Sequence, residues 1–541
     1  MTGPAAFGRD VAAAFDGANF TLLGATAIVV AILLIVTYRS PVLWIVPLVV
    51  VGTGDQLTAQ LLPWIARLIG ERTDAQVAGI VTVLVFGAGT DYALLLIARY
   101  REELRRHEDR REAMAEALRN AGPAVLASAT TVILALLTLL AALLTGNRTL
   151  GIAAALGIAV ALVFGLVVLP AALVCFGRWV FWPFAPTLGS DDPTATGLWS
   201  RVAGTVGRHP GRVLVVSLLI LGALSAGVGL TQVGVLQTDQ FRTEVESVTA
   251  QETLARHFPA GASELVVVLA ATPTATEVAR VVRGTPGVAA LIGRPERSDD
   301  GTLTRLTVEL RDGSGTAGAD AAIEALRSRL AAVDGADALV GGPPAADLDQ
   351  RDANTRDDLL IVPLIVAVVL VVLVILLRSL TAPLLLVLTV LATYAGALGA
   401  ATLVLRSVFD MPALDAGVPL LGFLFLAALG VDYNIFLATR AREETTKLGS
   451  TGAGMLRALT VTGGVITSAG ILLAAVFAVL GVLPVIALTQ IGVLVGIGVI
   501  LDTLLVRTLL VPALALLLGE RFWWPAHPAG RSDRPGRHAA R

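Results

Sequence analysis

Eleven long apolar stretches run through this chain, and they limit its fold more than any other feature of the sequence. A helix of about 20 apolar residues spans the hydrocarbon core of a bilayer. Only 15% of the residues are charged, against about 25% in soluble domains, so one water-exposed globule would not hide this apolar surface. The sequence therefore predicts a polytopic α-helical membrane protein with about eleven transmembrane helices, at about residues 20–37, 42–63, 78–98, 123–144, 149–176, 211–230, 358–377, 382–405, 417–438, 462–483 and 486–518.

The arginines gather on one side of these helices if successive helices alternate in direction. Cytoplasmic loops of membrane proteins are enriched in Lys and Arg, so the arginine-rich segments and the C-terminus are predicted to be cytoplasmic. An odd number of helices then places the N-terminus outside. Because residues 1–19 contain neither a signal peptide nor a further helix, we expect the chain to lack its original beginning. The arginine-rich segments are 99–119, 178–212, 440–457 and 521–541.

One large polar insertion, residues 231–357, interrupts the apolar stretches. Its alternating patterns predict a small α+β domain of the ferredoxin-like type. Its place between helices that begin in the cytoplasm puts it on the extracytoplasmic side. The predicted elements are strands at 264–270, 288–293, 303–310 and 338–341, and helices at 275–284 and 318–332.

The sequence contains an internal repeat with an offset of about 341 residues. Gly89-Thr90-Asp91-Tyr92 is followed by Arg99, Arg101, Glu102 and Glu103, and Gly430-Val431-Asp432-Tyr433 is followed by Arg440, Arg442, Glu443 and Glu444. Residues 1–176 therefore correspond to about 341–518. Further matches are Gly3-Pro4 with Gly342-Pro343, Asp10 with Asp349, Arg39-Ser40 with Arg378-Ser379, Ser128 with Ser468, and Pro170 with Pro512.

Only the second copy is preceded by a helix and a soluble domain. We therefore predict that residues 1–19 are the remnant of a lost first domain of the same kind. The predicted organisation is a first transmembrane repeat, a cytoplasmic linker, a transmembrane helix, the extracytoplasmic α+β domain, a second transmembrane repeat and a cytoplasmic tail. These parts cover residues 20–176, 177–210, 211–230, 231–357, 358–518 and 519–541, respectively.

Two aspartates lie inside predicted transmembrane helices at equivalent positions of the repeat. Asp91 and Asp432 each come eight residues before an arginine at the cytoplasmic end, or about 12 Å along a helix. A charge at the bilayer centre costs on the order of 2.5–3.5 kcal/mol, so each aspartate is expected to face protein or water. A carboxyl group away from water can bind and release a proton near neutral pH. The doubled Asp-Tyr pairs therefore predict a proton relay formed by Asp91, Tyr92, Asp432 and Tyr433.

The two repeats are expected to pack around a pseudo-twofold axis. Asp91 would then bond to Tyr433, and Asp432 to Tyr92. Protonation of an aspartate would remove its charge, weaken the bond and change the packing of the repeats.

Three further side chains are candidates to support this relay. Ser128 and Ser468 are equivalent, although serines in such helices more often serve in helix packing. Asp502, near the middle of the last helix, would extend the relay or pair with Arg507. Asp55 has no acidic counterpart in the second copy, and we expect it to face water near the outer end or in a cavity rather than to take part in proton coupling.

Several other chemistries find no support in the sequence. There is no nucleotide-binding loop of the Walker type, the five histidines show no metal-ligand spacing, and Cys175 is the only cysteine. No nucleophile with a matching base emerges, and no concentrated basic face suggests nucleic-acid binding. We therefore expect a protein that is not an enzyme and uses no metal, cofactor or nucleic acid.

The strings Gly-x-Asp-Tyr-x6-Arg-x-Arg-Glu-Glu at 89–103 and 430–444 resemble the large mycobacterial membrane protein (MMPL) branch of the resistance-nodulation-division (RND) transporters. The stretch 499–512 resembles that family's last helix. The resemblance implies an exporter of lipids, glycolipids or hydrophobic small molecules in the plasma (inner) membrane, driven by proton flow. It also implies that the relay residues are the two Asp-Tyr pairs, and that oligomers or cell-envelope partners are to be considered.

The chain departs from that family's pattern of twelve helices and two extracytoplasmic porter domains. Two alternatives therefore stay open, namely a truncated, inactive transporter and a membrane scaffold or lipid-binding sensor that does not transport. A proton-driven accessory of protein translocation is a third, which the doubled Arg-x-Arg-Glu-Glu string disfavours. The strong preference for arginine, with Lys447 as the only lysine, suggests a GC-rich, actinobacterial source.

Overall fold

The computed structural model describes residues 18–70, 75–188, 197–235, 245–257, 264–483 and 485–528, with positions 6, 9, 10, 13 and 242. Gly3-Pro4 and the end of the tail, residues 529–541, lie outside the described residues. The chain forms two compact units. One contains residues 1–16, 234–356 and 484–486, and the other contains residues 17–233, 357–483 and 487–541.

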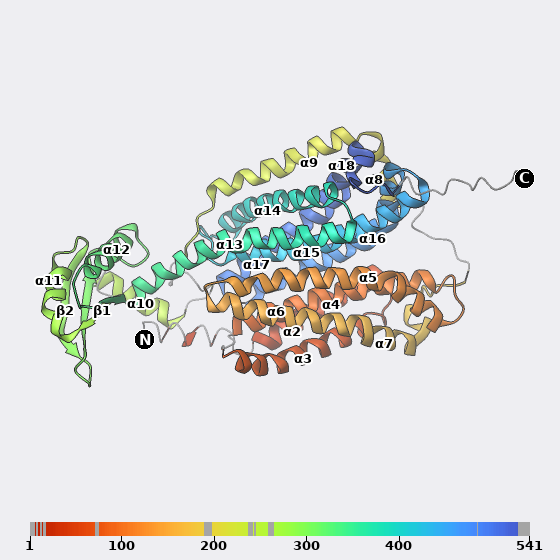
Figure 1. Cartoon of the computed structure of the whole chain (residues 1–541). Coiled ribbons are helices and arrows are strands. Elements are labelled where there is room, and N and C mark those ends of the chain that lie inside the picture. Colours follow the sequence, from red (N-terminus) through yellow and green to blue (C-terminus); the bar gives the residue numbers. More distant parts are fainter. Residues whose placement is uncertain are drawn as a thin grey trace, which may run out of the picture. The chain divides into compact units, whose positions relative to one another are not determined.

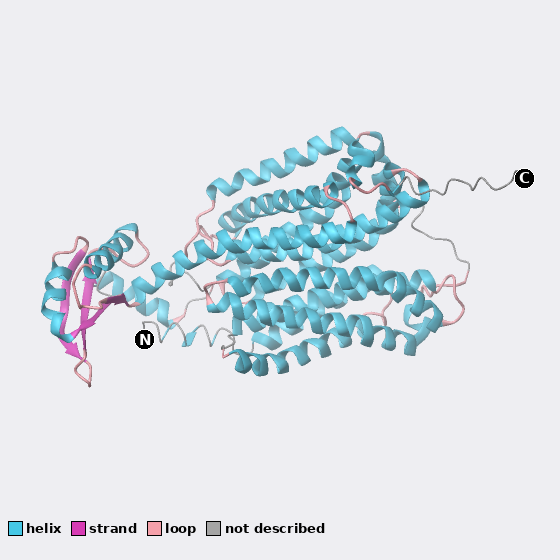
Figure 2. Ribbon diagram, viewed as in Figure 1, coloured by secondary structure: helices cyan, strands magenta, loops and turns pink. Residues whose placement is uncertain are grey.

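The second unit is a bundle of long helices that run alongside one another (Figures 1 and 2). Among the described residues, eleven helical runs are long and apolar enough to cross a membrane, which confirms the prediction. The first repeat contains α2 (Ala18–Tyr38), α3 (Ile45–Ile69), α4 (Ala75–Glu103), α5 (Arg110–Leu137), η1 (Thr138–Ala141), α6 (Thr145–Val163), η2 (Phe164–Val168), α7 (Leu169–Phe176) and η3 (Gly177–Phe181). Next come α8 (Leu198–Arg208), α9 (Pro210–Ser225) and η5 (Ala226–Leu230). The second repeat contains α13 (Pro343–Leu377), α14 (Thr381–Val408), α15 (Val418–Leu448), α16 (Thr451–Ala478), η8 (Val479–Val482), α17 (Ile486–Leu501), η9 (Asp502–Leu510), α18 (Val511–Leu518) and η10 (Gly519–Trp523).

Two helices form the centre of this bundle. In the spans of α4 and α15, 94% of the most apolar window is buried, whereas only 17% is buried in the span of α9. A span that lipid surrounds keeps its apolar side chains at the protein surface, as α9 does with Leu219 at 66% exposed. The helices that contain the two Asp-Tyr pairs are therefore those most enclosed by protein.

The backbone repeats as the sequence does. Arg39 and Arg378 both have positive φ, at 52° and 47°. The hydroxyl groups of the serines that follow them, Ser40 and Ser379, donate to carbonyl oxygens at 2.8 Å and 3.4 Å near the end of each repeat. A π-helical segment, η2 or η9, precedes each of the matched prolines. The bundle is thus built from two copies of one helical unit.

The Arg-x-Arg-Glu-Glu motifs repeat as well. Arg99 lies 2.5 Å from Glu102 and 3.4 Å from Glu103, and Arg440 lies 3.1 Å from Glu443 and 3.0 Å from Glu444. All four ion pairs join residues three or four apart on one helix, a spacing that stabilises a helix by about 0.2–0.5 kcal/mol per pair. The doubled Arg-x-Arg-Glu-Glu string therefore strengthens the ends of α4 and α15.

The first unit contains a four-stranded antiparallel sheet with the strand order β2-β3-β1-β4. In chain order the elements form a βαββαβ unit, which is the ferredoxin-like arrangement predicted. Valines and leucines of β1 and β3 alternate between buried and more exposed positions and pack against the two helices. The elements are β1 (Val266–Ala271), α11 (Ala275–Arg283), β2 (Val288–Arg297), β3 (Leu303–Leu310), α12 (Ala317–Ala331) and β4 (Leu339–Gly341).

Two short helices were missed by the sequence prediction. These are α10 (Glu246–His257) and α8, which lies in the segment predicted as a linker. The apolar residues of α8, such as Val206, occupy one narrow face. A short amphipathic helix of this kind is not a long apolar run, so a search for membrane-spanning runs does not find it.

The core of the sheet unit gives a first testable prediction. Replacing Ile323, which is 0% exposed, with Ala should lower the free energy of unfolding of this unit by about 2–5 kcal/mol, because it leaves a cavity. In the full chain, hydrogen exchange of the amides in β1 and β3 should then become at least roughly 30-fold faster. Leu339→Ala, at a position 69% exposed, is the control and should change exchange little. Equal exchange in both variants would contradict this account of the core.

Candidate functional site

The two central helices bring their aspartates together between the repeats. Asp91 on α4 and Asp432 on α15 are 5% and 7% exposed, and the adjacent tyrosines are 1% and 2% exposed. The hydroxyl group of Tyr433 donates a hydrogen bond of 2.9 Å to Asp91 Oδ1. The predicted bond between Asp91 and Tyr433 is therefore confirmed, and it links the first repeat to the second.

The reciprocal bond is not formed, so that part of the prediction is wrong. The hydroxyl group of Tyr92 and Oδ1 of Asp432 have no hydrogen-bond partner among the described residues. Ser128 of α5 lies close enough to interact with both. Ser128 therefore lies beside Tyr92 and Asp432, and its support of a relay stays a prediction.

A buried arginine explains why the two sides differ. Arg507 on η9 lies over the ring of Tyr433, with 4.3 Å between the guanidinium carbon and the ring centroid. By the repeat offset, the equivalent residue in the first copy is Gly165, which has no side chain and lies against Tyr92. A cation over a ring face is an attractive contact. It holds Tyr433 in place, and Tyr92 has no such support.

Arg507 also pairs with Asp502, which lies five residues earlier. Arg507 Nη2 contacts Asp502 Oδ2 and donates to the carbonyl oxygen of Gly430 at 3.2 Å. The arginine is 1% exposed and the aspartate 4%. Of the two roles predicted for Asp502, pairing with Arg507 is the one that the geometry shows. The π-helical turn η9 contains both residues.

The cluster contains more carboxyl groups than cations. Asp91, Asp432 and Asp502 surround a single guanidinium group, which interacts with all three. The effective cost of burying an uncompensated ion is several kcal/mol, so proton binding is favoured because it brings the negative net charge of the cluster closer to zero. The arrangement is therefore chemically suited to take up and release protons. The sequence identified these aspartates but did not assign Arg507 its central place.

Two other predicted residues lie apart from this cluster. Ser468 donates to the carbonyl oxygen of Gly464 on its own helix at 3.0 Å, so its hydroxyl group serves the backbone. Asp55 is 3% exposed and interacts with Thr82 of α4, so the prediction that it faces water near the outer end is wrong, and its place in a cavity stays a prediction. In the described part of the chain, no group of three or more His, Cys, Asp or Glu residues is placed to bind a metal ion.

The helical bundle and its central carboxyl groups define a membrane transporter of the RND type, and comparisons with known proteins agree. The sequence model of the MMPL family matches residues 1–213 and 234–538. The chain therefore belongs to the MMPL family, as the sequence motifs suggested.

Its relatives include a membrane protein of unstated role and two exporters. The membrane protein ActII-3 of Streptomyces coelicolor is 47% identical over all of this chain and 75% of that protein. The apo-petrobactin exporter of Bacillus anthracis is 33% identical over 98% of this chain and 75% of that protein. The acyltrehalose exporter MmpL10 of Mycobacterium tuberculosis is 38% identical over 37% of this chain and 20% of that protein.

A solved structure supports the fold. The translocon-associated membrane protein SecDF of Thermus thermophilus matches with a TM-score of 0.57 and 16% sequence identity. The match covers 92% of this chain and 61% of SecDF. At this identity the likeness concerns the fold alone.

Proposed function

We propose that this protein is an exporter in the plasma (inner) membrane, driven by proton flow through the cluster of Asp91, Asp432 and Asp502. The observation that supports this most directly is the hydrogen bond from Tyr433 to Asp91, because it joins the two repeats through a group that can be protonated. Relay residues on this proposal are Asp91, Tyr92, Asp432 and Tyr433, with Ser128 beside them.

Protonation of Asp91 would alter this bond directly. A hydrogen bond to a charged group contributes about 1.5–3 kcal/mol, and a bond between neutral groups contributes about 0.5–1.5 kcal/mol. One charge that crosses the membrane supplies about 2.3 kcal/mol per 100 mV. The proton therefore brings an energy of the same size as the interaction it changes. Because α4 and α15 belong to different repeats, this change acts on the packing between them.

The proposed substrates are lipids, glycolipids or hydrophobic small molecules. The family and the name of one relative, an acyltrehalose exporter, support the lipid class. A second relative, an apo-petrobactin exporter, supports export of a small molecule. We propose that residues 231–357 face outside, that the arginine-rich helix ends face the cytoplasm, and that the source is actinobacterial, as the Streptomyces relative suggests. Membrane lipids are the expected surroundings on this proposal.

The energy source is tested by efflux of the lipophilic dye Nile red from cells that express the protein. A protonophore should reduce efflux to the level of cells with an empty vector, while cellular ATP is held constant with glucose. Asp91→Asn and Asp432→Asn at equal membrane abundance should have the same effect without the protonophore. Efflux that continues unchanged after the proton gradient collapses would exclude proton coupling. If the wild type shows no efflux of any tested lipophile, a scaffold or an inactive transporter becomes the better description.

A further inference from the structure

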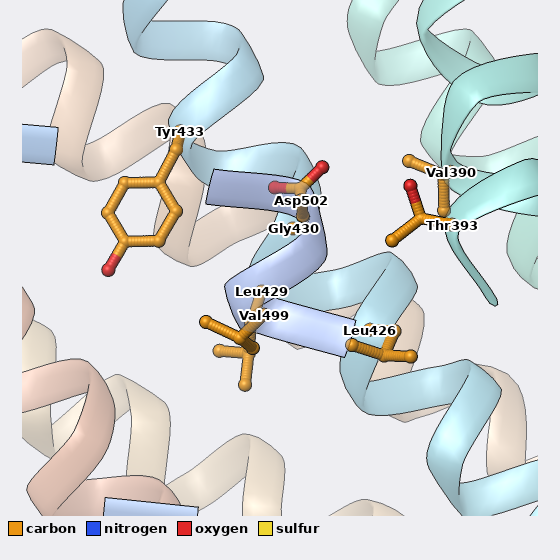
Figure 3. Close-up of a pocket in the computed structure, with 8 residues that line it drawn as sticks. All are labelled: Val390, Thr393, Leu426, Leu429, Gly430, Tyr433, Val499 and Asp502. Carbon is orange, nitrogen blue, oxygen red and sulfur yellow. The ribbon is translucent and has the colours of Figure 1, made fainter. Parts of the chain in front are cut away.

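A small cavity lies beside the buried ion pair, between α14, α15 and the segment in which α17 becomes η9 (Figure 3). Its volume is about 10 Å³. A cavity holds one water molecule when its volume on this measure reaches about 10–15 Å³ and it offers two to four polar partners. Its walls include Val390, Thr393, Gly430, Tyr433, Val499 and Asp502.

The walls offer such partners. Figure 3 shows the carboxyl group of Asp502 and the hydroxyl group of Thr393 on different sides of the cavity. Both residues are buried, at 4% and 3% exposed. The Thr393 hydroxyl group donates to the carbonyl oxygen of Thr389 at 2.8 Å, so its oxygen can still accept a hydrogen bond. A water molecule between them would donate to both Thr393 and Asp502.

The equivalent place in the first repeat is apolar and filled. By the repeat offsets, Thr393 corresponds to Gly54, and Asp502 corresponds to Val160. A Cβ atom on Gly54 would lie 3.3 Å from the ring of Phe164, so this ring occupies the space beside it. The two repeats therefore differ at this place, and the polar cavity is found in the second repeat.

We propose that this cavity binds one water molecule, held by Asp502 and Thr393, through which Asp502 exchanges its proton. This inference rests on the proposed function. When this water takes up a proton, it passes one proton to the Asp502 carboxylate and stays in the cavity as water, and the reverse step releases the proton. Thr393 is a positioning residue for this water.

The contacts of Arg507 connect this site to the Asp-Tyr pair. When Asp502 is charged, it holds the guanidinium group, which also lies over Tyr433. Protonation of Asp502 removes the charge that pairs with Arg507, and this weakens the hold on the ring that donates to Asp91. Proton exchange at the cavity is thereby coupled to the bond between Tyr433 and Asp91. The first repeat has no equivalent coupling, because glycine replaces arginine there.

Two substitutions act on the cavity by different means. Thr393→Val removes the hydroxyl group and keeps the shape of the side chain. Gly430→Ala adds a methyl group whose carbon would lie 3.7 Å from the nearest Asp502 carboxylate oxygen, an ordinary contact that needs no movement of the backbone but takes the place of the water. Thr389→Val is the matched control. Its hydroxyl group is also buried and donates to a helix carbonyl, that of Leu386 at 2.8 Å, and it is not part of the cavity wall.

The water is observed directly by infrared difference spectroscopy of the purified full-length protein in nanodiscs, in H₂16O against H₂18O. The wild type and Thr389→Val should show an isotope-sensitive O–H stretching band of an isolated water that changes when Asp502 is protonated. Thr393→Val and Gly430→Ala should lose it. Initial rates of Nile red efflux should fall at least fivefold in these two variants at equal membrane abundance, and Thr393→Ser should restore most of the rate.

The outcomes separate this inference from the proposed function. If Asp91→Asn stops efflux while Thr393→Val and Gly430→Ala keep the wild-type rate and band, the relay stands and the water site is overturned. If Asp91→Asn leaves efflux unchanged, the proposed function fails. In that case the infrared band still decides whether the cavity binds water, and its presence in Gly430→Ala would overturn the site.

Discussion

Replacing Asp91 with Asn should reduce export at least 100-fold, to the level of cells without the protein. An Asn side chain has nearly the same shape, and its Oδ1 can still accept the hydrogen bond that Tyr433 donates over 2.9 Å. It cannot bind a proton, however, so under the proposed function the bond between α4 and α15 would no longer respond to the proton gradient. The expected defect is in transport and not in folding. It is measured as initial efflux rates at equal membrane abundance, with thermal unfolding of the purified protein compared in parallel.

Asp55→Asn is the matched control for this substitution. Asp55 is also a buried aspartate of the first repeat, at 3% exposed, but it interacts with Thr82 and not with the cluster. Export should remain within about twofold of the wild type. If both substitutions stop export equally, the loss reflects any buried carboxyl group of the bundle, and the specific role of Asp91 is refuted. If Asp91→Asn exports at the wild-type rate, proton coupling through this residue is wrong.

The second large effect is expected on stability. Arg507→Met should lower the free energy of unfolding by about 3–5 kcal/mol, the usual result of removing one partner of a buried ion pair. The reason is that Asp502, at 4% exposed, is left as a buried charge without its partner. Unfolding is followed in bicelles by steric trapping, which reports the free energy of unfolding without a denaturant.

A double substitution separates the charge from the packing. Arg507→Met combined with Asp502→Asn should recover most of the lost stability, because no unpaired charge remains, while export stays low. Arg406→Met, at an exposed arginine whose side chain donates to the carbonyl of Leu230, is the control and should change stability by less than about 0.5 kcal/mol. If Arg507→Met alone is as stable as the wild type, the ion pair between Arg507 and Asp502 does not stabilise η9.

Much of the fold could be predicted from the sequence because its signals are local. Each transmembrane span is a run of apolar residues, and the strands and helices of the sheet unit follow their own periodicity. Strand β3 was predicted with the bounds that the structure shows, Leu303–Leu310. The Asp-Tyr motif was also visible, since a repeated Asp-Tyr pair inside an apolar run is rare and costly.

The asymmetry of the site could not be predicted, because it depends on contacts between helices. The repeat suggested two equal bonds, but only the bond of Tyr433 to Asp91 is formed. Arg507 and Gly165 occupy matched positions, and their difference in size and charge acts only once η9 and η2 pack against the tyrosines. Ser468 matched Ser128 in sequence and yet bonds to its own helix. Sequence periodicity says which face a residue occupies, and not which partner reaches it.

The bond between Tyr433 and Asp91 also limits how this protein can evolve. A duplicated gene usually leaves each copy free to drift, but here a carboxyl group of one copy needs a phenol of the other. Selection therefore acts on the two repeats together, and not on each repeat by itself. In relatives that lack an aspartate at the position of Asp91, we expect the tyrosine at the position of Tyr433 to be replaced before the tyrosine at the position of Tyr92. Two half-length proteins should restore activity only when both are expressed together, because neither half contains this bond by itself.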